Sequence, residues 1–186
     1  MFCMANTLGS RKLWIYVHLI LAAFFMPFLL IMPISGTGYL LDFKGSQEKT
    51  EAFRLSTIPT EAGAEQEAFF REEFKKNGID FDFEYIRGSK TNLIFRPATR
   101  VHYTAALEEG GQWVVSQVNP SLMSRLIELH KGHGPRIMRW FEIAFGIALV
   151  LTTLSGLWLA WTVKPYRTAT IVSFGLGALA IAACMI

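Results

Sequence analysis

Two histidines stand three positions apart at the start of a long uncharged segment. The stretch "ELHKGHGPRIMRW" (residues 128–140) contains His130 and His133, then a Gly-Pro pair. Two cations, Arg136 and Arg139, follow within the same stretch. Imidazole is a common ligand of metal ions and of haem iron. At the edge of a membrane, histidine and a nearby tryptophan can also anchor the chain. From these residues alone, metal ligation, cofactor ligation and interfacial anchoring all stay open.

A third histidine lies inside a different uncharged run. His18 is the only ionisable imidazole in "LWIYVHLILAAFFMPFLLIMPI" (residues 13–34). Ionisable side chains within a bilayer are costly and generally have a partner or a function. Two interpretations follow for His18. It is an axial haem ligand, or it forms an interhelical hydrogen bond to a serine, a threonine or a backbone carbonyl.

Hydrophobic patterning defines the elements that position these histidines. Hydrophobic residues make up 52% of the 186-residue chain, and three runs carry no formal charge: 13–34, 143–163 and 168–186. A helix needs about 20 mostly apolar residues to cross the hydrocarbon core of a bilayer. The first run is longer than a signal-peptide core and has no clear small-x-small cleavage site, so we expect a retained anchor. The predicted order is an N-terminus (1–12), a transmembrane helix (13–41), an extramembrane domain (42–134), a second transmembrane helix (135–163), a loop (164–168) and a third transmembrane helix (169–186). Glycines that permit close approach within the first two spans are Gly36, Gly38, Gly146 and Gly156.

The basic residues beside these runs set the expected orientation. Arg11 and Lys12 precede the first run, and Lys164 and Arg167 lie between the second and third. Under the positive-inside rule both flanks are cytoplasmic, so the domain at 42–134 faces the opposite side. The formal net charge of +3 then reflects topology and gives no case for nucleic-acid binding.

Cysteine usage excludes two kinds of site. The chain has two cysteines, Cys3 and Cys184. The predicted topology places them on opposite sides of the membrane, which excludes an intramolecular disulfide. The domain at 42–134 has no cysteine, so it contains no thiolate metal site.

The charged segment predicts a small α+β domain made of a helix and an antiparallel sheet. Helical periodicity covers 58–80, with Thr60 as the expected N-cap. In "RVHYT", strand alternation places His102 opposite the apolar residues, so we expect this histidine to face solvent. Further predicted elements are strands at 79–88, 91–97, 99–107 and 112–118, an amphipathic helix at 121–132, and an additional strand within 51–57.

Three stretches together resemble the PepSY-associated transmembrane (PepSY-TM) family over nearly the whole length. They are "RKLWIYVHLILAAF" with "PISGTGYLL", the α+β domain, and "LHKGHGPRIMRWFEIAFGIALVLTTLSGLWLAW". The resemblance implies a bacterial inner-membrane protein with a PepSY-like periplasmic domain. It also implies haem b held by His18 and His130, and electron transfer linked to ferric-siderophore reduction. Additional cofactor contacts implied in this way are His133, and Arg136 and Arg139 toward the haem propionates.

This chain corresponds to one half of the larger family members, with a third span and without a second PepSY unit. The expected spans place His18 and His130 near opposite membrane faces, roughly 25–30 Å apart at 1.5 Å per helical residue. One chain therefore cannot use both histidines on the same iron. A two-fold homodimer would pair each histidine with its mate, and a larger membrane complex is the other arrangement. The alternative function is a non-enzymatic, membrane-anchored PepSY adaptor or assembly subunit.

Overall fold

The computed structural model describes residues 3–59 and 63–186, and their backbone divides into two compact units. The first unit contains the chain up to Leu29 together with Ile143–Ile186, and the second contains Leu30–Glu142. Two long helices contribute to both units. They are α1 (Cys3–Leu40) and α4 (Arg136–Thr162).

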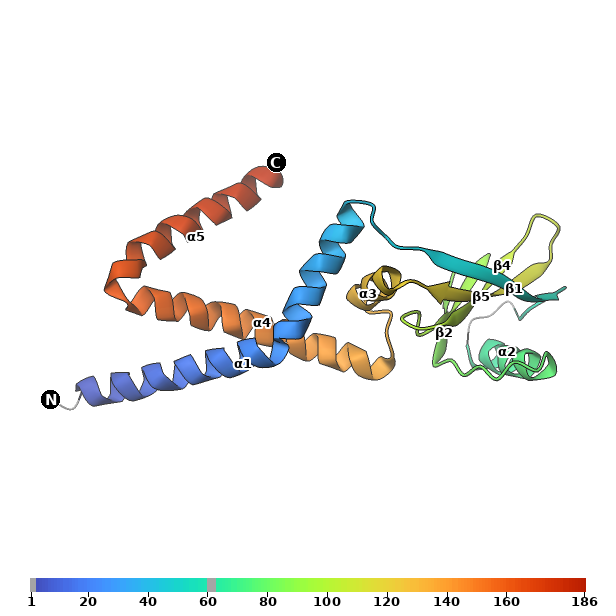
Figure 1. The fold of residues 1–186 in the computed structure, drawn as a ribbon, viewed down its shortest axis with the longest axis horizontal. Helices are drawn as coiled ribbons and strands as arrows, with labels where there is room; N and C mark the ends of the chain where they lie inside the picture. Colours follow the sequence, from blue (N-terminus) through green and yellow to red (C-terminus); the bar gives the residue numbers. More distant parts are fainter. Residues whose placement is uncertain (1–2, 60–62) are drawn as a thin grey trace. The chain divides into compact units, whose positions relative to one another are not determined.

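Among the described residues, three helices are long and apolar enough to cross a membrane, as the sequence predicts (Figure 1). They are α1, α4 and α5 (Lys164–Cys184). In the first unit α1 and α4 pack antiparallel, with the ring of Phe145 4.8 Å from that of Phe28 and 5.6 Å from that of Phe25. Val163 alone separates α4 from α5, where we predicted a loop over 164–168. Proline is favourable in the first helical turn, so Pro165 allows α5 to begin directly at Lys164.

The second unit contains a five-stranded antiparallel sheet in the order β1-β5-β4-β3-β2. This confirms the α+β class. The strands are β1 (Gln47–Leu55), β2 (Tyr85–Gly88), β3 (Asn92–Arg96), β4 (His102–Leu107) and β5 (Trp113–Pro120). The two short helices are α2 (Ala64–Lys76) and α3 (Leu122–His130). The predicted N-cap Thr60 lies outside the described residues, and the position before α2 is Gly63.

Aromatic side chains form the core between α2 and one face of the sheet. Phe70 and Phe74 of α2 place their rings 4.8 Å and 5.3 Å from that of Phe95 on β3. Phe81 and Phe83 join this cluster, although residues 79–84 are not a strand. The prediction of a strand over 79–88 was therefore wrong for residues 79–84. The alternating pattern reflected burial of the phenylalanines, and only Tyr85–Gly88 pairs with β3.

The second face of the sheet is covered at one end by α3. His102 lies on this face and is buried, so the prediction of a solvent-facing histidine was wrong. Alternation along β4 correctly separated His102 from Tyr103 and Ala105, which face the aromatic core. The error arose because α3 covers the side that we expected to be open to water.

Candidate functional site

The first feature of the site is a hydrogen-bonded setting for His130. Its Nδ1 lies 3.0 Å from Ser35 Oγ and 3.0 Å from the carbonyl oxygen of Met32, both on α1. Ser35 is fully buried, and its hydroxyl donates to the carbonyl of Ile31 at 2.8 Å. Since that donation uses the only hydroxyl proton, both oxygens near Nδ1 act as acceptors. His130 therefore carries its proton on Nδ1, and in the neutral ring the lone pair lies on Nε2.

His18 has the same setting in the other unit. Its Nδ1 lies 3.0 Å from Ser155 Oγ and 3.1 Å from the carbonyl oxygen of Thr152, both on α4. The hydroxyl of Ser155 donates to that same Thr152 carbonyl at 2.9 Å and is buried. Because the hydroxyl proton of Ser155 is already donated to this carbonyl, the hydrogen in the contact with His18 belongs to Nδ1, and Nε2 of the neutral ring is the acceptor.

A glycine completes each setting by allowing the imidazole to approach the helix. A Cβ added at Gly36 would lie 3.1 Å from Cε1 of His130, and one at Gly156 would lie 3.3 Å from Cε1 of His18. Such contacts are closer than ordinary van der Waals packing. We call each arrangement a Ser-Gly cradle, meaning Ser35-Gly36 for His130 and Ser155-Gly156 for His18, with the carbonyl three residues before the serine.

The cradles give each ring a fixed tautomer and orientation. Histidines that ligate metals donate the hydrogen of the second ring nitrogen to a carbonyl, a carboxylate or a similar acceptor. The interhelical hydrogen bond that we considered for His18 is thus the observed contact, and it involves Nδ1 and not Nε2. Sequence reasoning singled out both histidines but not the serines that hold them.

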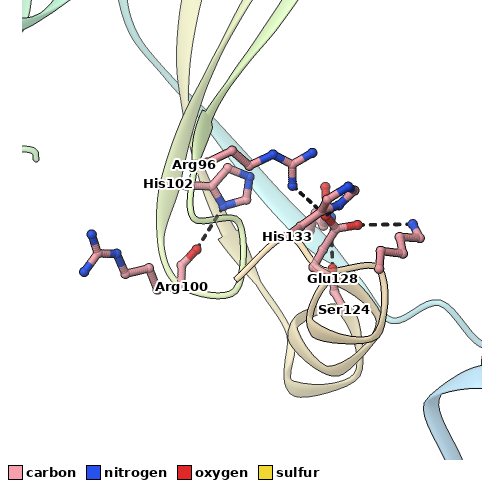
Figure 2. A network of polar contacts seen from close by, with 8 residues as sticks. Arg96, Arg100, His102, Ser124, Glu128 and His133 are labelled. Atoms are coloured by element: carbon pink, nitrogen blue, oxygen red, sulfur yellow. Dashed lines mark hydrogen bonds and ion pairs between the residues drawn. The ribbon is translucent and has the colours of Figure 1, made fainter. Parts of the chain in front are cut away.

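His133 belongs to a separate polar cluster around Glu128 of α3 (Figure 2). Its Nδ1 lies 2.7 Å from Glu128 Oε2, which also accepts from Arg96 Nη1 at 3.0 Å. Lys131 Nζ donates to the other carboxylate oxygen at 3.2 Å. Burial alone would raise the pKa of Glu128, but hydrogen bonds from His133, Arg96 and Lys131 outweigh it and hold that pKa below its ordinary value. At neutral pH Glu128 is thus an anion that ties α3 to the sheet.

His102 lies beside this cluster without joining it. Its Nδ1 is 2.9 Å from the carbonyl oxygen of Arg100, and Figure 2 shows the ring apart from Glu128. Burial lowers the pKa of His102 below its ordinary value, since the charged ring loses its hydration, although the hydrogen bond to Arg100 offsets part of this effect. His102 is therefore neutral at physiological pH and serves the packing of the domain.

His133, Arg136 and Arg139 meet at a pocket of about 660 Å³ that His130 does not line. The backbone N–H of Arg136 donates to Glu84 Oε2 at 2.7 Å, and its guanidinium donates to the Glu84 carbonyl at 3.2 Å. The predicted cofactor-binding residues thus separate into three places: the His18 cradle, the His130 cradle and this pocket.

Among the residues that the structure describes, no group of three or more His, Cys, Asp or Glu side chains could hold a metal ion. No protein-family model, no curated protein and no solved structure matches the chain.

Proposed function

We propose that this protein is a haem b-binding electron-transfer subunit of the bacterial inner membrane, with His18 and His130 as iron ligands. The supporting observation is the repeated Ser-Gly cradle, which commits Nδ1 to oxygen acceptors and leaves Nε2 available in both rings. In this proposal the N-terminus is cytoplasmic and the sheet domain is periplasmic, as the basic flanks indicate.

The residues around each imidazole have defined roles in the proposal. Each serine and carbonyl orient a ring and make its Nε2 more basic, which strengthens a bond to iron. Beside the His18 cradle, Ser155 lines an apolar hollow of about 200 Å³ with Trp14, Leu151, Leu154 and Trp158. Such an apolar wall suits the face of a porphyrin. When bound, the haem supplies one-electron transfer.

Each cradle holds one histidine, so any further protein ligand to a haem bound there would come from outside the cradle. We propose that a homodimer, or a larger membrane complex, supplies it. In a two-fold dimer each histidine faces its own mate, because isologous contacts pair identical residues. The proposed link to ferric-siderophore reduction rests on the PepSY-TM resemblance. We found no flavin or nicotinamide motif in the sequence, so in this proposal a partner protein supplies the electrons.

The test is the visible absorption spectrum of the full chain, purified in mild detergent after expression with ample haem. We expect a haem b spectrum that dithionite reduces. His18→Gly or His130→Gly will lose absorbance, and added imidazole will restore part of it by occupying the emptied ligand position. His102→Gln is the matched control and will keep the wild-type spectrum. A folded but colourless wild-type protein would refute the proposal and favour the adaptor function.

A further inference from the structure

The pocket at the start of α4 is strongly basic and differs from the two cradles. Its lining includes Arg87 of β2, Arg96 of β3, Lys131 after α3, and Arg136 and Arg139 of α4. None of the described residues that line it is acidic. A volume of about 660 Å³ lies within the usual range of small-ligand sites, roughly 300–1,000 Å³.

The carboxylates near the pocket do not cancel its charge. Glu84 caps the backbone N–H of Arg136, Glu128 accepts from Arg96 and Lys131, and Glu142 neighbours Arg139. Five lining cations therefore face three neighbouring carboxylates, which leaves a formal surplus of two positive charges. Like charges gathered in one concavity attract an anionic ligand.

One of the lining cations, Arg96, is buried and held in place. Arg96 is only 4% exposed, and its Nε has no hydrogen-bond partner among the described residues. Its Nη1 is held by Glu128, which fixes the guanidinium at the pocket. The Arg96 guanidinium is therefore a fixed positive charge in the pocket wall, which needs no side-chain rearrangement to act on a ligand.

We propose that this pocket binds a phosphate group. Guanidinium forks match phosphate oxygens in geometry as well as charge, and the surplus of two accommodates either a singly charged phosphodiester or a doubly charged phosphate. On the side of α4 the pocket is lined by Trp140, which is 72% exposed. Tryptophan and arginine at the end of a membrane helix typically contact the headgroup layer. The phosphate therefore belongs to an anionic lipid headgroup or to a soluble phosphate compound, and neither source requires haem.

The test uses the purified full chain, coloured or colourless. Native mass spectrometry counts the phosphatidylglycerol and the phosphatidylcholine molecules that remain bound, and calorimetric titration with inorganic phosphate measures the soluble ligand. The pocket variant is Arg87→Gln with Arg139→Gln, since both side chains are exposed and their loss leaves the buried Arg96 pair intact. The control is Arg54→Gln with Lys75→Gln, which removes the same charge from exposed positions outside the pocket.

We expect the pocket variant to lose binding about ten-fold or more, because charge-assisted hydrogen bonds are lost, while the control binds as the wild type does. Selective retention of phosphatidylglycerol without binding of inorganic phosphate assigns the site to a lipid headgroup. Binding of inorganic phosphate assigns it to a soluble compound. Equal losses in the pocket and control variants, or no binding of either probe by the wild type, would overturn the proposal.

Discussion

Glu128 is the anion on which the junction between α3 and the sheet depends, and its replacement gives the most informative stability test. Glu128→Gln removes the negative charge but keeps the size of the side chain. The Arg96 side chain, 5% exposed, then keeps its positive charge without a counter-ion. Removing one partner of a buried ion pair typically costs about 3–5 kcal/mol. Lys131 adds little to this value because its side chain is 40% exposed and screened by water.

The loss in free energy of unfolding is measured by urea titration in mild detergent. Near-ultraviolet circular dichroism, to which the buried Trp113 contributes, follows the unfolding. The double change Arg96→Met with Glu128→Leu is expected to stay close to the wild type, since neither buried charge then remains. The surface control Glu108→Gln breaks an ion pair whose partners are about half exposed and should cost less than about 1 kcal/mol. A cost for Glu128→Gln no larger than that of the control would refute the reasoning.

Three further predictions concern other parts of the molecule. Burial lowers the pKa of His102 in the folded domain, so protons bind the unfolded chain more readily and stability falls as the pH drops below about 6.5. Thermal unfolding between pH 7 and pH 5 will show this fall, and His102→Gln will reduce it. Phe74→Ala removes a core ring that is 1% exposed and should cost about 3–5 kcal/mol in a urea titration. Ser155→Ala should weaken haem retention about 10–100-fold in transfer to a haem acceptor, whereas Thr153→Ala, a neighbouring exposed hydroxyl, should not.

Local patterns were sufficient to predict the three apolar helices and the α+β class. Uncharged runs and strand alternation depend on neighbours within a few positions. The helices and the class that they predicted are confirmed, whereas the alternation over 79–84 reflected burial and not a strand. The position of His102 depended on where α3 docks, and docking is a contact between distant segments. The helix itself was predicted, but its periodicity does not show which face of the sheet it covers.

The two cradles also depend on contacts between distant segments, which the sequence pattern does not predict. The sequence identified His130 as a candidate ligand, and Gly36 and Gly156 only as glycines that permit close approach of helices. The partner of His130 is Ser35, 95 positions earlier, and the partner of His18 is Ser155, 137 positions later. No spacing rule connects residues so far apart. A partial signal did exist, since the two Ser-Gly pairs both lie in predicted transmembrane helices, but it did not indicate which histidine each pair contacts.

The repeated cradle allows the structural and the ligating roles of histidine to be separated. A hydrogen bond between helices requires only the Nδ1–H, and an asparagine amide at the same position can donate to the same serine and carbonyl. Ligation additionally requires the Nε2 lone pair, which asparagine lacks. His130→Asn should therefore leave the thermal unfolding midpoint near that of the wild type while the part of the haem absorbance that belongs to the His130 site is lost. If His130→Asn instead keeps the full absorbance, the His130 cradle serves packing alone, and the iron ligands must be sought elsewhere.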